Sequence, residues 1–190
     1  MNSTFENKLS QIYWNRFQQF GSTPQGSFWA TEARQTRRFE IILSETDKLS
    51  GAAGCSLADI GCGYGALVDY LLKRPASSVT SYIGYDISEQ LIAACKHKFE
   101  KPWARFICSS APDQEQDCSV MSGPFNLAAT RDLVLWQNYV FGTLQGCWSH
   151  TKVAMIFNLQ VASSARISPQ SHIYYANSDQ VLEHCVARFG

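Results

Sequence analysis

The feature that most constrains this chain is a glycine run that joins a short apolar stretch to a helical pattern. Residues 57–72 read LADIGCGYGALVDYLL, with Gly61, Gly63 and Gly65 on alternate positions. Glycine adopts positive φ angles and lets a ligand approach the backbone closely, and the first turn of a helix presents free N–H groups. The run therefore predicts a buried parallel strand, a tight turn and a helix, with a nucleotide-like ligand above the turn.

A second strand pattern, YIGYDIS over residues 82–88, ends in an acid, Asp86. A carboxylate at the end of the strand after the first helix is placed to accept hydrogen bonds from both hydroxyls of a ribose. Its distance from the glycine run is near the roughly 20 residues expected for that role. We interpret the turn and Asp86 as two parts of one nucleoside site. The alternative is a structural glycine turn beside an unrelated surface acid.

Strand patterns and helical patterns alternate along the whole chain. This alternation predicts an α/β fold with a parallel sheet covered by helices on both faces. Ligands of such sheets bind beyond the carboxyl ends of the strands. The strands are expected at residues 57–60, 79–85, 104–108, 118–121 and 152–159, and a polar loop containing His172, Tyr174 and Tyr175 is expected before a last helix over 178–189.

Polar residues stand at the carboxyl ends of these expected strands. Two of them, Asn126 and Asn158, are the best candidates for catalytic residues that orient a substrate, because an amide can both donate and accept hydrogen bonds. The alternative for both is backbone capping at strand ends. The full set is Asp86, Ser110, Ser122, Asn126 and Asn158.

The N-terminal part precedes this alternating pattern. Residues 2–20 carry apolar side chains at helical spacing, and a loop over 21–27 leads to Phe28 and Trp29. We expect residues 1–29 to form a helical extension or lid, and residues 30–190 to form the main domain. Arg34, Arg37 and Arg38 follow on a second expected helix, either as a solvated face or with one guanidinium on a ligand carboxylate.

Composition excludes several classes of function. Lys+Arg and Asp+Glu both total 16, so the chain lacks the basic footprint of a nucleic-acid-binding protein. No apolar run approaches the length of a membrane helix, and the first residues lack a secretory pattern, so a cytoplasmic protein is expected. The seven cysteines include no C-x-x-C pair, which favours reduced thiols over a disulfide framework or a metal site.

These motifs resemble those of class I S-adenosylmethionine (AdoMet)-dependent methyltransferases. The spacing D-x-G-x-G-x-G is similar to their first motif and differs from the G-x-G-x-x-G of dinucleotide-binding folds. The closest resemblance is to a small, little-characterised bacterial group. Its members carry S-G-x-F-N after strand four, here SGPFN at residues 122–126, and an F-N pair at the end of strand five, here Phe157 and Asn158.

The resemblance implies a Rossmann-like sheet with strand order 3-2-1-4-5, AdoMet as cofactor and S-adenosylhomocysteine as product. The family usually ends with a C-terminal hairpin beside strand five, and this sequence shows no pattern for one. Strand five would then be an open edge, which an oligomer or a partner could cover. The implied cofactor-binding residues are Arg38, Asp59, Gly61, Gly63, Gly65, Asp86, Ile87, Ser110 and Ser122.

The function implied by the resemblance is methyl transfer from AdoMet to a small-molecule acceptor. The absence of a basic footprint argues against a nucleic-acid acceptor. Two alternatives stay open: a non-catalytic module that binds AdoMet or a partner, and an AdoMet-dependent enzyme that does not methylate. A nicotinamide dehydrogenase is disfavoured by the glycine spacing.

Overall fold

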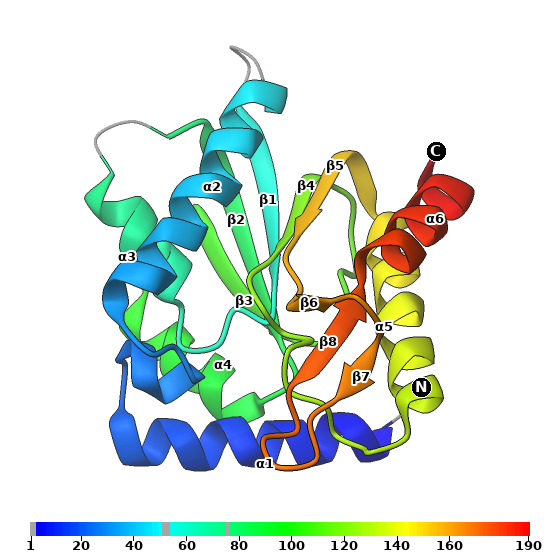
Figure 1. The fold of residues 1–190 in the computed structure, drawn as a ribbon. Helices are drawn as coiled ribbons and strands as arrows, with labels where there is room; N and C mark the ends of the chain where they lie inside the picture. The colour runs from blue at the N-terminus through cyan, green and yellow to red at the C-terminus, as the bar shows by residue number, and fades with distance from the viewer. Residues whose placement is uncertain (1–2, 51–53, 75–76) are drawn as a thin grey trace.

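The computed structural model describes residues 3–50, 54–74 and 77–190 of the chain (Figure 1). Residue 2, expected in the first helix, lies outside these ranges. None of the helices in these ranges is long and apolar enough to cross a membrane. The helices are α1 Ser3–Phe20, the 3₁₀ helix η1 Pro24–Ser27, α2 Glu32–Ser50, α3 Ala66–Lys73, α4 Glu89–Lys98, α5 Leu133–Trp148 and α6 Ser178–Phe189. The strands are β1 Cys55–Ile60, β2 Val79–Asp86, β3 Ala104–Cys108, β4 Gln116–Met121, β5 Thr151–Phe157, β6 Val161–Ala162, β7 Arg166–Ile167 and β8 Tyr174–Asn177.

Five strands form one parallel sheet in the order β3-β2-β1-β4-β5, which confirms the predicted order. Ile60 pairs with Tyr85 across β1 and β2, so the glycine turn and Asp86 follow neighbouring strand ends. The order reverses at β1, where the crevice beyond the strand ends is the usual ligand site of an open α/β sheet. β5 forms the edge of this sheet, as predicted.

Helices cover both faces of the sheet, and two hydrophobic cores result (Figure 1). Leu57 faces the core under α2, α3 and α4, whereas its neighbour Ala58 faces the core under α5. On β2, Tyr82 likewise faces the core under α2, α3 and α4, and Ile83 faces the core under α5. This division follows from the two-residue period of a strand, whose successive side chains point to opposite faces. Both faces are therefore buried, as a parallel sheet requires.

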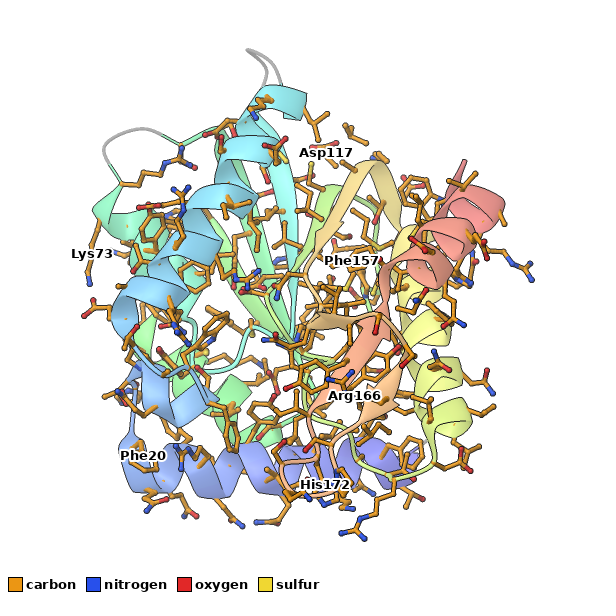
Figure 2. All side chains as sticks on the ribbon, in the orientation of Figure 1. Phe20, Lys73, Asp117, Phe157, Arg166 and His172 are labelled. Atoms are coloured by element: carbon orange, nitrogen blue, oxygen red, sulfur yellow. The ribbon has the colours of Figure 1, made fainter. Side chains whose placement is uncertain are left out.

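The segment after β5 corrects one prediction. Residues 174 and 175 were expected in a polar loop, but β8 lies there, between β6 and β7 in a separate three-stranded sheet. Tyr174 is only 1% exposed and packs in the α5 core. Arg166, labelled with His172 in Figure 2, places its guanidinium over the Tyr175 ring. β8 has only four residues, and β6 and β7 have two each, so none of them is long enough for a clear alternation in the sequence, which explains the error.

Helix α1 packs across the body of the protein, along the lower edge in Figure 1. Leu9 is buried in the α5 core. The Lys8 ammonium donates a hydrogen bond to the Ala129 carbonyl oxygen at 2.7 Å. The Phe5 ring contacts the rings of Trp136 and Tyr139. The N-terminal helix is thus anchored to the main core by both apolar and polar contacts.

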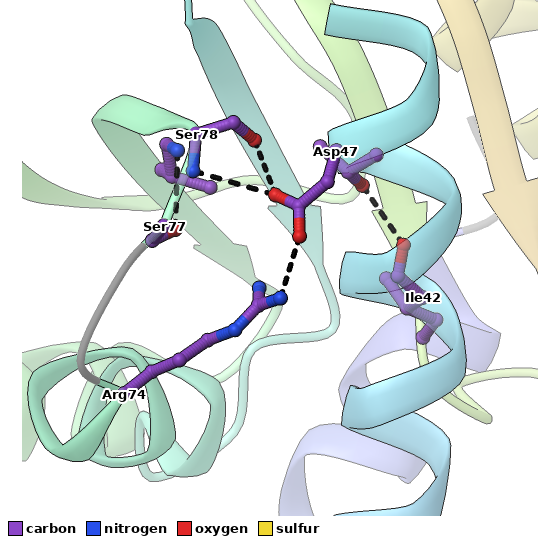
Figure 3. A network of polar contacts seen from close by, with 7 residues as sticks. Ile42, Asp47, Arg74, Ser77 and Ser78 are labelled. Atoms are coloured by element: carbon purple, nitrogen blue, oxygen red, sulfur yellow. Dashed lines mark hydrogen bonds and ion pairs between the residues drawn. The ribbon is translucent and has the colours of Figure 1, made fainter.

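A polar cluster joins α2 to the segment between α3 and β2 (Figure 3). The Asp47 carboxylate accepts hydrogen bonds from the Ser78 hydroxyl at 2.6 Å and from the Arg74 guanidinium. Partial burial pushes the pKa of Asp47 upward, but the bonds from Ser78 and Arg74 outweigh it and lower the pKa below 3.8. The cluster therefore stabilises the fold in the ionised form of Asp47.

We expect Asp47→Ala to lower the free energy of unfolding by about 1–2 kcal/mol at pH 7, because charge-assisted hydrogen bonds are lost from a half-buried site. A carboxyl group whose pKa is lowered on folding stabilises the protein at pH values above the pKa it has in the unfolded chain. This contribution is lost as the pH falls below 3.8. Urea unfolding should therefore show a smaller difference at pH 3 than at pH 7. Glu45→Ala, in an exposed pair with Lys48, is the control with little effect. Equal losses for Asp47→Ala at both pH values would contradict this assignment.

Candidate functional site

The glycine turn is held against the end of β2. The backbone N–H groups of Gly61 and Cys62 both donate to the Tyr85 carbonyl oxygen, at 2.8 and 3.0 Å. The φ angles of Gly61, Gly63 and Gly65 are +76°, +56° and +80°, a region that other residues rarely adopt. These φ angles are by themselves a reason for glycine at all three positions, as the sequence predicts.

The surroundings of the three glycines differ. A Cβ on Gly61 would lie 2.8 Å from Pro124 Cβ, and a Cβ on Gly65 would lie 2.4 Å from the Phe99 ring. A Cβ on Gly63 would meet no atom of the described residues within 4 Å. The absence of a side chain at Gly61 and Gly65 thus leaves space for Pro124 and Phe99, whereas Gly63 borders open space.

Asp86 links the turn to the next helix. One of its carboxylate oxygens accepts a hydrogen bond from the Gly63 N–H and the other from the Ser88 N–H, both at 2.9 Å. Ser88 in turn caps α4 by accepting a bond from the Leu91 N–H. Burial raises the pKa of Asp86, and the bonds from Ser88 and Gly63 oppose this rise. The carboxylate is therefore buried, orientated by two donors, and without a cationic partner among the described residues.

Asp59 is a second buried carboxyl, at the end of β1. The Tyr82 hydroxyl donates a hydrogen bond to its Oδ2 at 2.6 Å. Burial raises the pKa of Asp59 to about 7, with the Tyr82 bond opposing the rise and the nearby Asp86 charge adding to it. Two buried acids therefore lie close together, an arrangement that a cationic ligand would stabilise.

A cavity of about 1200 Å³ lies over the turn and Asp86. Gly65 and Asn158 do not line it. The Asn158 Oδ1 is instead buried without a hydrogen-bond partner among the described residues, so the expectation that this side chain faces the substrate does not fit the structure. The sequence-predicted residues that do line the cavity are Arg38, Asp59, Gly61, Gly63, Asp86, Ile87, Ser110, Ser122 and Asn126.

Several wall residues were not singled out in the sequence as site residues. Tyr13 on α1, in the segment expected as a helical extension or lid, lines the cavity, and its ring centroid lies 5.3 Å from that of Phe28 in an edge-to-face arrangement. Burial and the nearby Asp86 charge raise the pKa of Tyr13. Tyr139 of α5 both packs on Trp136 and lines the cavity. An aromatic residue at helical spacing gives the same sequence pattern whether it packs in the core or lines a cavity. The sequence alone therefore does not distinguish these two roles for Tyr13 and Tyr139.

The chain is similar to known methyltransferases in sequence. A family profile described as a methyltransferase domain matches residues 57–152. The Mycobacterium tuberculosis protein Rv1506c, which carries a provisional methyltransferase name, is 33% identical over 135 residues. That match covers 70% of this chain and 80% of Rv1506c.

Solved structures show the same fold. Magnesium protoporphyrin IX methyltransferase from Synechocystis PCC 6803, with bound S-adenosylhomocysteine, has a TM-score of 0.72 at 11% identity, covering 99% of this chain and 89% of that one. A SAM-dependent methyltransferase from Leishmania major has a TM-score of 0.71 at 12% identity, covering 95% and 73%. At these identities the likeness concerns the fold. Together with the profile and Rv1506c, it shows that the chain belongs to the class I AdoMet-dependent methyltransferase family.

Proposed function

We propose that this methyltransferase moves the methyl group of AdoMet to a small-molecule acceptor inside the cavity. The observation that carries this proposal is that the open side of Gly63 and the buried Asp86 carboxylate border one cavity of about 1200 Å³. Typical small-molecule sites measure about 300–1,000 Å³. The cavity therefore has room for a cofactor and an acceptor together.

The residues around the turn fit AdoMet. Open space beside Gly63 lets the ribose and methionine parts approach the backbone. Asp86, already orientated by two N–H donors, has lone pairs left to accept hydrogen bonds from the ribose hydroxyls. Ile87 would pack on the adenine and Ser110 would border it. Bound AdoMet supplies an activated methyl group on a positively charged sulfur, and the chain supplies position and orientation.

Other lining residues suit the charged methionine part of AdoMet. The Arg38 guanidinium is well shaped for the methionine carboxylate. Asp59, buried beside Asp86, would be stabilised by the positive charges of the cofactor. The Ser122 hydroxyl is buried without a partner among the described residues, and a cofactor atom could supply one.

Residues 1–29 are proposed as the lid of this site. Leu9 and Tyr13 of α1, and Phe28 and Trp29 after η1, all line the cavity. The Arg16 Nε donates to the Gln25 carbonyl oxygen at 2.9 Å, which ties α1 to η1. By covering the cavity, this segment would exclude water from the reaction.

We expect the affinity for AdoMet to weaken below pH 7, up to about tenfold per pH unit. The pKa of Asp59 is about 7 without a ligand, and a cationic ligand lowers it, so protonation competes with binding. Above pH 7 the affinity should level off. Calorimetry between pH 5.5 and 8.5 measures the dissociation constant, and Asp59→Asn should flatten the profile. A flat profile in the wild type would remove Asp59 from the site.

Turnover tests the proposed function itself. Purified protein with AdoMet and the small-molecule fraction of a bacterial extract should release S-adenosylhomocysteine. Asn126 lines the cavity, so Asn126→Ala should lower this release about tenfold or more while cofactor affinity stays within about twofold. AdoMet binding without any methyl consumption would favour a non-catalytic module. If Asn126→Ala lowers the affinity for AdoMet rather than the turnover, Asn126 binds the cofactor and not the acceptor.

A further inference from the structure

The loop after β4 lines the cavity next to the glycine turn. Trp29 lies against this loop: a Cβ on Gly123 would stand 3.8 Å from Trp29 Cζ2 and 3.0 Å from Asn126 Nδ2. The Asn126 Oδ1 accepts a hydrogen bond from the Gln160 N–H at 3.3 Å. Its Nδ2 has no acceptor among the described residues and keeps two N–H donors. An indole wall and an amide donor therefore meet at one place.

Of the described residues, three that carry a positive charge line the cavity, and all three lie in the first half of α2. Arg37 is already paired, since its Nη1 lies 3.0 Å from a Glu40 carboxylate oxygen. The guanidinium groups of Arg34 and Arg38 have no hydrogen bond or ion pair with the described residues. These two are four positions apart and share one face of the helix. If Arg38 holds the methionine carboxylate of the cofactor, Arg34 is left for an anionic group on the acceptor.

Among the residues that the structure describes, none that lines the cavity is a suitable general base. No histidine of the described chain lines it. Burial raises the pKa of Tyr13, Tyr64 and Tyr139, and that of the Cys62 thiol, so all four keep their protons at neutral pH.

The two acids among the described lining residues, Asp59 and Asp86, lie beside the glycine turn. Asp86 accepts hydrogen bonds from Gly63 and Ser88, and Asp59 accepts one from Tyr82. The pKa of Asp59 without a ligand, about 7, would suit a general base. A cationic cofactor beside Asp59 would lower that pKa. The acceptor atom must therefore arrive as a nucleophile without a proton to lose. A protonated amine would also be repelled by the arginines.

We infer that the acceptor is a small, largely apolar molecule with a carboxylate, and that a carboxylate oxygen receives the methyl group. This inference rests on the proposed function. The oxygen forms a bond to the methyl carbon as the carbon–sulfur bond breaks, and its electron pair stays on sulfur. The products are a neutral methyl ester and S-adenosylhomocysteine, and no proton is released. Arg34 and Asn126 hold the carboxylate, and Trp29 packs on the apolar part.

Matched probes test this assignment by calorimetry. The protein is saturated with S-adenosylhomocysteine and titrated with phenylacetate, indole-3-acetate and dodecanoate, each paired with its neutral amide. At least one carboxylate should bind tenfold or more tightly than its amide. Arg34→Gln should reduce that ratio to near one and leave S-adenosylhomocysteine affinity unchanged. Arg105→Gln, outside the cavity, is the control and should keep the ratio.

A second measurement identifies the atom that is methylated. Carboxylates that bind are incubated with methyl-tritiated AdoMet, and the transferred label should be released as volatile methanol by alkali, as methyl esters require. Amides that bind as well as carboxylates, alkali-stable label, or carboxylates that bind without being labelled would each overturn the inference. An Arg34→Gln variant that loses cofactor affinity would overturn the role of Arg34. Failure of the wild type to bind S-adenosylhomocysteine would instead overturn the proposed function.

Discussion

Gly63→Val should abolish AdoMet binding in a protein that still folds. The Cβ of residue 63 would enter open cavity space, with no other atom of the described residues within 4 Å, so the side chain fills the volume that the cofactor needs. The backbone at φ +56° is strained for any residue with a Cβ, by about 1–2 kcal/mol, and more for a β-branched one. Calorimetric titration with AdoMet, alongside a thermal melt, measures both effects.

Two other glycines separate strain from cofactor exclusion. Gly21 has φ +62° and also has open space around its Cβ position, but it does not line the cavity. Gly21→Val should therefore show a similar loss of stability and normal AdoMet affinity. Gly65→Ala should lose more stability than Gly21→Val, because its Cβ would lie 2.4 Å from the Phe99 ring in addition to the backbone strain. A folded Gly63→Val protein with wild-type affinity would mean that the cofactor lies elsewhere.

Asp86→Ala should weaken AdoMet binding by about 1–3 kcal/mol, which is about 5-fold to 150-fold. The change removes the acceptor proposed for the ribose hydroxyls. It also leaves the N–H groups of Gly63 and Ser88 without their carboxylate partner. Asp86→Asn keeps one acceptor oxygen and should lose less AdoMet affinity than Asp86→Ala. The dissociation constant of each variant, measured by calorimetry at pH 8, gives the ordering.

The control for Asp86 is another acid that accepts one well-defined bond. The Asp113 carboxylate accepts from the Tyr85 hydroxyl at 2.8 Å and does not line the cavity. Asp113→Ala should leave AdoMet affinity within about twofold. An unchanged dissociation constant for Asp86→Ala would remove Asp86 from the cofactor site, even if the protein still methylates.

The sheet and the position of the cavity could be predicted because they rest on strong, local signals. The alternation of strands and helices predicts a parallel sheet, and the strand order that the family resemblance implies is the order of β1 to β5 in the structure. The glycine run and Asp86 fall at the ends of adjacent strands, as their spacing indicates. Each of these signals depends on a few neighbouring residues and on rules of chain connection.

Other features depend on contacts that the sequence does not specify. Gly61, Gly63 and Gly65 look equivalent as letters, and only the positions of Pro124 and Phe99 distinguish their surroundings. The hydrogen bond from Tyr82 to Asp59 joins two strands through side chains whose orientation no spacing rule provides. Because side-chain surroundings come from packing, motif patterns predict them poorly.

Asn158 shows the same limit at a strand end. A polar residue just after a parallel strand is often a ligand residue, but its place in the sequence does not determine whether its side chain lines a cavity. The N–H of Asn158 donates to the Met121 carbonyl oxygen at 3.3 Å, and its Oδ1 is buried outside the cavity lining. Asn126, in contrast, lines the cavity as expected from its place after β4.

The central claim is that the turn at Gly63 and the acid Asp86 together bind AdoMet, and its most direct test is a calorimetric titration of the folded protein at pH 8. Heat of binding with AdoMet and with S-adenosylhomocysteine, at one site per chain and lost in Gly63→Val, is the expected result. No binding heat with either compound in a protein that melts cooperatively would contradict the account.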